Sequence, residues 1–233
     1  MRIKTDKLWD LSQPLAHDGP AWAEFDPPSI TRNYRCAAEG YNLESVQLKT
    51  HMGTHVDVPF HYYDDGATVD QMPLEAFAAP AAFLDLRAVL AADQAIEPEQ
   101  LRGSLDLLRE GDIAVLVTGW GEKRGVNEDF LKRWPYLGGP GAELLLERGA
   151  SGVGIDALSI GGWGSAEKGD PSHVVLLSAG KPIVEDLRIP AELIGRRCFL
   201  TAFPVLLEGC SGAWTRAVAW ELDDGAEQDR LRD

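Results

Sequence analysis

The chain has 233 residues, of which 45% are hydrophobic and 25% charged, a composition typical of a folded globular protein. This length can bury a substantial core, and we expect a single domain over residues 1–233. The formal net charge of −15 repels polyanions, which argues against nucleic acid or an anionic membrane as a partner.

Three cysteines without a CxxC pair suggest reduced thiols. The N-terminus lacks the apolar core of a signal peptide, and no run approaches the roughly 18 apolar residues of a membrane span. We therefore expect a cytoplasmic protein.

Alternating apolar and polar residues predict strands over residues 8–12 and 41–50. Between them, residues 14–28 are rich in Pro and Gly and carry Trp22 and Phe25. Such an irregular segment either lines a ligand pocket or subunit contact, or folds back on the core.

Side chains that could bind a metal ion or transfer a proton are most concentrated between His51 and His61, where three of the five histidines occur together with Asp57. On an α-helix, at about 100° per residue, His51 and His55 would share a face while Asp57 and His61 would lie roughly 120° away. An extended chain places all four on one side, but it separates His51 from Asp57 by about 20 Å. Gly53 is the natural place for a bend, and we predict a kinked segment.

Neutral imidazole and carboxylate groups suit zinc, manganese or iron(II). An isolated histidine such as His17 is ordinarily a core or surface residue, and chance clustering is the alternative for the four grouped side chains. Their even spacing favours a metal site.

Downstream, short helical patterns alternate with buried strands. We expect strands at residues 81–86, 113–118, 151–156, 182–185, 198–202 and 215–219, and helices at residues 73–77, 97–111, 142–148 and 171–179. The Gly-rich residues 159–169 lack the GxGxxG and GK[ST] patterns, so we do not expect a phosphate site there. The acidic residues 221–233 are expected to fray.

The stretch His51-x-Gly53-Thr54-His55-x-Asp57-x-Pro59-x-His61 resembles the signature of the cyclase-like metal-dependent hydrolases, which include bacterial kynurenine formamidase and isatin hydrolase. The likeness continues through Asp10-Leu11-Ser12-Gln13-Pro14-Leu15, Thr118-Gly119-Trp120, Gly152-Val153-Gly154-Ile155-Asp156 with Ser159, and His173 followed by Glu185. The resemblance implies an α/β protein with a swivelling β/β/α fold, and a homodimer or homotetramer.

The same resemblance implies the roles of the polar residues. His51, His55 and Asp57 would bind one ion, and Asp57 would bridge to a second ion held by His173 and Glu185. The cofactors would be one or two divalent ions, Zn or Mn, with His61 as the catalytic proton-transfer residue.

The resemblance and the aromatic residues suggest a small-molecule substrate and the reaction that it undergoes. We expect hydrolysis of an aryl formamide or of a cyclic amide such as isatin, with Trp22, Tyr62 and Trp120, and also Tyr63, as candidates to hold a planar substrate. Ordinary packing is the alternative for each aromatic residue. The loop after the first strand departs from the family's Pro-x-Trp-Pro-Gly-Asp, because Ala23-Glu24-Phe25-Asp26 follows Trp22. A further departure lies behind Ser159, where Ile160-Gly161-Gly162 replaces the usual acidic residue.

Two other functions fit the same residues. The protein could hydrolyse a lactone or a cyclic imide, or it could be a non-catalytic binding module that holds metal for structure. A Ser or Cys nucleophile is poorly supported, because no GxSxG or Cys-His arrangement occurs.

Overall fold

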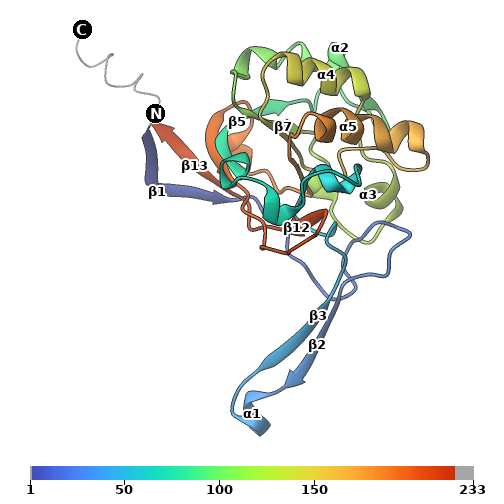
Figure 1. Ribbon diagram of the computed structural model, residues 1–233, viewed down its shortest axis with the longest axis vertical. Coiled ribbons are helices and arrows are strands. Elements are labelled where there is room, and N and C mark those ends of the chain that lie inside the picture. Colours follow the sequence, from blue (N-terminus) through green and yellow to red (C-terminus); the bar gives the residue numbers. More distant parts are fainter. Residues whose placement is uncertain (1, 224–233) are drawn as a thin grey trace.

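The computed structural model describes residues 2–223 and is built around one mixed sheet (Figure 1). In spatial order the sheet contains β1 (Arg2–Asp10), β13 (Val218–Asp223), β11 (Arg197–Thr201), β5 (Ala78–Asp85), β7 (Ile113–Val117), β9 (Gly152–Ile155), β10 (Ile183–Glu185), β4 (His55–Asp57) and β12 (Gly212–Trp214). The four strands from β5 to β10 are parallel, and the flanking pairs are antiparallel.

The helices are short. They are α1 (Cys36–Glu39), α2 (Pro98–Leu101), α3 (Glu128–Lys132), α4 (Gly139–Glu147) and α5 (Ala166–Ser178). Single 3-10 turns are η1 (Pro59–His61), η2 (Val69–Gln71), η3 (Leu74–Phe77), η4 (Leu105–Leu107), η5 (Trp120–Lys123) and η6 (Ala191–Leu193). Two small ribbons pair β2 (Ser29–Tyr34) with β3 (Leu43–Gln47), and β6 (Ala95–Ile96) with β8 (Tyr136–Leu137). None of the helices within residues 2–223 is long and apolar enough to cross a membrane.

The two faces of the sheet bury different cores, because successive side chains of a strand point to opposite faces. On β5, Leu84 packs with Leu145 of α4 and Leu176 of α5 in a core between the sheet and the helices. Phe83 points the other way, into a core that also contains Leu200 of β11.

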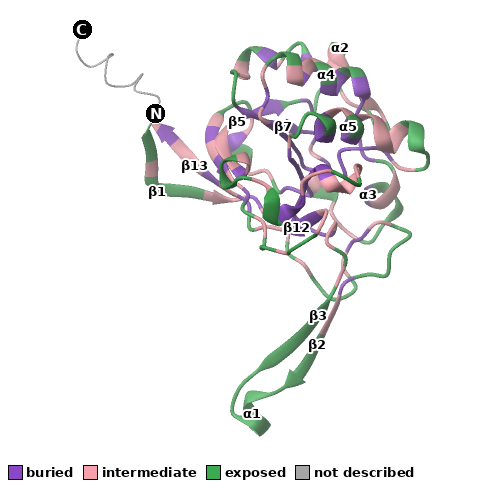
Figure 2. Ribbon diagram, viewed as in Figure 1, coloured by how far each residue is buried: buried purple, intermediate pink, exposed green. Residues whose placement is uncertain are grey.

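The second core is closed by the sheet itself. Val56 of β4 and Ala213 of β12 belong to the same buried cluster as Leu200 and Ala219, although these strands come from opposite halves of the sheet. The sheet therefore curls around this core, and Figure 2 shows the buried strands at its centre.

Several sequence predictions agree with the structure. The strands expected at residues 81–86, 113–118, 151–156, 182–185 and 198–202 correspond to β5, β7, β9, β10 and β11. The strand expected at residues 8–12 overlaps only the end of β1, which begins at Arg2 and ends at Asp10. The strand expected at residues 41–50 forms as the shorter β3, and the helix expected at residues 142–148 forms as α4. Of the tail expected to fray, residues 224–233 lie outside the described residues, whereas residues 221–223 belong to β13.

Other predictions were wrong. The helix expected over residues 97–111 stops at Leu101, because Gly103 and Ser104 favour the turn before η4. The helix expected from residue 171 begins earlier, at Ala166, so Pro171 lies inside it. Proline has no N–H group to donate to the carbonyl of Glu167, but Glu167 is exposed to solvent.

Three further differences concern short elements. Residues 215–219 are not one strand, since residues 215–217 connect β12 to β13. Residues 73–77 hold only the 3-10 turn η3, and β2 forms where no strand was expected.

Candidate active site

Two of the expected site residues, His55 and Asp57, belong to β4, which lies between β10 and β12. They form the centre of a cluster of polar side chains. Val56 points into the curled core, so His55 and Asp57 point to the opposite face, toward the helices. The antiparallel register places Glu185 of β10 directly opposite His55. Three ligand-type side chains therefore meet at one end of the helical face, and all three are buried.

The predicted kink is present. Gly53 has φ of +66°, and a Cβ atom there would lie 2.6 Å from Cδ2 of Leu15. This conformation is favourable only for glycine. The bend returns His51 toward β4, so that Nδ1 of His51 lies 2.7 Å from Oδ1 of Asp57.

His51 is held from its other side by the chain leading into β12. Its Nε2 lies 2.8 Å from Oγ of Ser211. A Cβ atom on Gly212 would lie only 2.7 Å from Cε1 of His51. The absence of a side chain at residue 212 thus makes room for the imidazole.

Backbone carbonyls fix the tautomers of His55 and His173. Nδ1 of His55 donates to the carbonyl of Gly53 at 2.8 Å, and Nδ1 of His173 donates to the carbonyl of Gly169 at 2.7 Å. The Nε2 atoms of the neutral rings therefore present lone pairs. Metal-bound histidines characteristically use their second nitrogen in this way.

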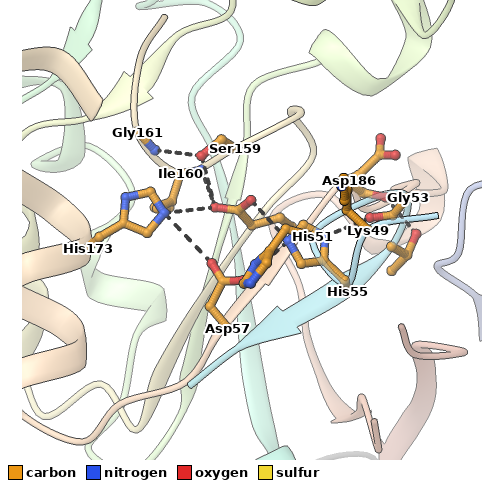
Figure 3. Close-up of polar contacts among 12 residues, drawn as sticks. Lys49, His51, Gly53, His55, Asp57, Ser159, Ile160, Gly161, His173 and Asp186 are labelled. Atoms are coloured by element: carbon orange, nitrogen blue, oxygen red, sulfur yellow. Dashed lines mark hydrogen bonds and ion pairs between the residues drawn. The ribbon is translucent and has the colours of Figure 1, made fainter. Parts of the chain in front are cut away.

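Both Nε2 atoms face carboxylate oxygens (Figure 3). Nε2 of His55 lies 3.2 Å from Asp57 and 3.4 Å from Glu185. Nε2 of His173 lies 3.4 Å from Glu185 and 3.7 Å from Asp57. Acceptors that face acceptors repel each other unless a proton or a cation lies between them.

The protein's own charges show how strongly this cluster attracts a cation. Burial alone would lower the pKa of His55, but the negative charges of Asp57 and Glu185 raise it to about 9. Burial likewise opposes charging of Asp57, yet His51 and His55 hold the pKa of Asp57 well below its usual range. Among the described residues, Nε2 of His55 and Oδ2 of Asp57 have no hydrogen-bond partner. The residues therefore fit a divalent cation.

Two groups of side chains converge closely enough to hold an ion. One consists of His55, Asp57 and Glu185, and the other of His51, Asp57 and His61. Asp57 belongs to both groups, and His173 approaches the first from α5. The structure thus brings together all six residues expected at the site. The grouping differs from the expected one, because His61 converges with His51 and Asp57, whereas Glu185 converges with His55. The division between metal ligands and proton-transfer residue stays a prediction.

Glu185 is positioned by the segment that follows β9. Its Oε1 accepts hydrogen bonds from Oγ of Ser159 at 3.1 Å and from the backbone N–H of Ile160 at 2.6 Å. Oε2 faces His55, so both oxygens have fixed directions.

His61 differs from its neighbours. Its ring stacks on His51 with 3.9 Å between the ring centroids, and within residues 2–223 its nitrogens have no hydrogen-bond or ion-pair partner. Burial and repulsion from His51 and His173 lower the pKa of His61 to about 4, although the negative charge of Asp57 acts to raise it. A neutral His61 at pH 7 can accept a proton.

A cleft of about 620 Å³ opens above the cluster, a volume that suits a small molecule. His51, His61, His173 and Glu185 line its inner end. The other walls contain Trp22, Glu24, Phe25, Tyr62, Leu158, Ser159, Trp163, Ser165, Ala166 and Asp170, together with Gly162, Gly164 and Gly169.

The three aromatic residues expected to hold a substrate are placed differently. Trp22 and Tyr62 line the cleft. Trp120 is 5% exposed, packs in the core between sheet and helices, and is not among the lining residues. The hydroxyl of Tyr63 donates to the carbonyl of Val174, and Tyr63 also lies outside the lining.

Sequence reasoning missed Trp163 and Asp170 as lining residues. Trp163 lies within the Gly-rich stretch and Asp170 directly after it, and that stretch was tested only against phosphate-binding patterns. Trp163 lies 4.7 Å from Trp22 between ring centroids, and Asp170 accepts a hydrogen bond from Tyr62. An aromatic residue inside a Gly-rich loop was the available signal.

Comparisons with known proteins agree with this geometry. The sequence profile of the family described as "Putative cyclase" matches residues 9–161. A kynurenine formamidase from Salinibacter ruber is 34% identical over 187 residues, covering 78% of this chain and 82% of that protein.

Solved structures extend the likeness to almost the whole chain. A structure described as a potential metal-dependent hydrolase with cyclase activity is 27% identical, with a TM-score of 0.76 over 93% of this chain and 98% of that one. Isatin hydrolase A from Labrenzia aggregata shares the fold, with a TM-score of 0.81 at 24% identity over 92% of this chain and 93% of that one. The chain therefore belongs to the cyclase family, has its α/β fold, and is a hydrolase of that family.

Proposed function

We propose that the protein hydrolyses the C–N bond of an aryl formamide, with a cyclic amide such as isatin as the related alternative. The main support for this proposal is the set of buried imidazole and carboxylate groups that face one another at the inner end of an aromatic cleft. The similarity to kynurenine formamidases supports an amide as the substrate.

The metal ligands in this proposal are His51, His55, Asp57, His173 and Glu185, which would hold one or two zinc or manganese ions. A divalent cation in such a site acidifies water and polarises a carbonyl group.

His61 would take the proton of the attacking water and return it to the nitrogen of the departing amine. Its position on the cleft wall, stacked on His51, suits this transfer. The new C–O bond forms as the C–N bond breaks, and the products are formate and an aryl amine.

The substrate would lie between the aromatic walls of the cleft. Trp22 and Tyr62 are the expected contacts, and Trp163 joins them. Trp120 would not contact the substrate directly, because it packs in the core and does not line the cleft. We further propose a cytoplasmic location and a homodimer or homotetramer.

The test combines metal analysis with a substrate panel. The purified enzyme should contain zinc or manganese and cleave formyl-kynurenine or formanilide, lose activity to a chelator, and recover it with added metal. Preferred cleavage of isatin, lactones or cyclic imides would reassign the substrate. A metal-loaded protein inactive on the whole panel would favour a binding module.

Two substitutions separate the proposed roles. His61→Asn should lower kcat by about 100-fold or more while metal content stays near normal. Asp57→Ala should instead remove most of the metal, since Asp57 belongs to both converging groups. Equal metal loss in the two variants would contradict proton transfer as the distinct role of His61.

A further inference from the structure

The charged side chains that line the cleft are all acidic once the histidines are set aside. They are Glu24, Asp170 and Glu185, and no lysine or arginine is among the lining residues. Glu185 is committed to His55, Ser159 and the backbone of Ile160. Two carboxylates, Glu24 and Asp170, are therefore left to meet the substrate.

Asp170 is held at a defined place. Its Oδ1 accepts a hydrogen bond from the hydroxyl of Tyr62 at 2.9 Å, and the ring of Tyr62 stacks on His173 with 4.9 Å between centroids. One phenol ring thus separates Asp170 from the polar cluster. Within residues 2–223, the second oxygen of Asp170 has no hydrogen-bond or ion-pair partner.

The nearest basic residue in sequence does not neutralise Asp170. Lys168 points elsewhere, because its ammonium group is paired with Asp93 at 2.7 Å. Glu24 is exposed, and no ion pair joins it to another described residue. The outer part of the cleft therefore keeps its negative charge.

Aromatic faces accompany these carboxylates. Trp22 and Trp163 meet at 4.7 Å with 58° between their planes, and Phe25 lines the same cleft. Electron-rich ring faces beside carboxylates are typical of sites that bind an ammonium group. A carboxylate in the same place would be repelled by Glu24 and Asp170 without a compensating cation.

We propose that the cleft selects aryl formamides that carry an ammonium group on the side away from the formamide, and discriminates against those that carry a carboxylate there. This inference rests on the proposed hydrolysis and specifies its substrate class. Glu24 and Asp170 are the specificity-determining residues, and Trp22 and Trp163 contact the cationic substituent.

Three formanilides with the same reacting group test the proposal. They are formyl-kynurenine, its analogue without the carboxylate, and its analogue without the amine. The amine-only compound should exceed the carboxylate-only compound in kcat/KM by about tenfold, the scale of a modest Coulomb difference in a partly hydrated cleft. The ratio should shrink as salt is added.

The double variant E24Q/D170N removes both charges, and the amide oxygen introduced at residue 170 can still accept the hydrogen bond from Tyr62. Its ratio of amine-only to carboxylate-only kcat/KM should fall below about threefold. Glu167→Gln is the matched control: Glu167 precedes Asp170 on α5 but does not line the cleft, so the ratio should persist. A ratio unchanged in the double variant, or a preference for the carboxylate, overturns the proposal.

A binding measurement separates this proposal from the proposed reaction. The deformylated amine-only and carboxylate-only compounds are titrated into the metal-loaded protein, with tryptophan fluorescence as the readout. Tighter binding of the amine, lost in the double variant, supports the inference even if no formanilide is cleaved. Cleavage of all three formanilides at equal kcat/KM leaves the reaction standing and refutes the selectivity.

Discussion

At the scale of single residues, Asp156 is a buried acid outside the proposed chemistry. It directly follows β9, is 2% exposed, and accepts hydrogen bonds from the backbone and hydroxyl of Thr118 and from the backbone of Gly119. Burial raises the pKa of Asp156 to about 6, although these hydrogen bonds oppose the shift. Its charge therefore changes in a range where the enzyme can be studied.

The sign of the effect follows from linkage. Between about pH 4 and 6 the folded state binds more protons at Asp156 than the unfolded state, so this residue's contribution to stability falls as pH rises. Asp156→Asn stays uncharged. The unfolding free energy of the parent protein minus that of the variant should therefore increase by roughly 2–3 kcal/mol from pH 7.5 to 4.5. Urea unfolding of both metal-free proteins measures this difference, and a flat profile would show that Asp156 keeps its ordinary pKa.

At the scale of elements, the site depends on how β10 ends. Asp186, directly after Glu185, has φ of +51° and is fully buried. Arg124 of the segment after η5 binds both of its oxygens, with Nη2 at 2.8 Å from Oδ2, and also reaches the carbonyl of Pro14. This ion pair fixes the chain next to a proposed metal ligand.

Arg124→Ala should be costly because it leaves the Asp186 carboxylate buried and unpaired. We expect a loss of about 3–5 kcal/mol in unfolding free energy. The matched control is Arg133→Ala, which breaks an exposed pair with Asp129 and should cost at most about 1 kcal/mol. Urea unfolding measures both, and equal small losses would mean that water reaches Asp186.

Only some features of these elements could be predicted from the sequence. The even spacing of His55 and Asp57 and the position of Gly53 predicted a shared face and a kink, because both depend on local backbone geometry. The pairing of Glu185 with His55 depends on strand register between distant segments, which local patterns do not show. The family resemblance placed Glu185 at the site, but with His173 rather than with His55. Trp163 and Asp170 were missed because composition does not say which side of a loop, or which face of a helix, lines a cavity.

At the scale of the whole molecule, the β2–β3 arm stands away from the body (Figures 1 and 2). Every residue from 31 to 47 is exposed, including Tyr34, Tyr41, Leu43 and Val46. A two-stranded hairpin alone is marginally stable in water. We therefore expect a second copy of the chain to cover this arm in the proposed homo-oligomer.

Charges placed on the arm should separate the subunits. Leu43→Asp combined with Val46→Asp puts carboxylates where the apolar contact is expected, so sedimentation velocity should show a dimer or tetramer for the parent protein and a smaller species for the variant. Leu206→Asp is the control, because Leu206 is 77% exposed on the body rather than the arm and should leave the assembly unchanged. A monomeric parent protein would refute the assembly, and an intact oligomer in the double variant would move the interface to another surface.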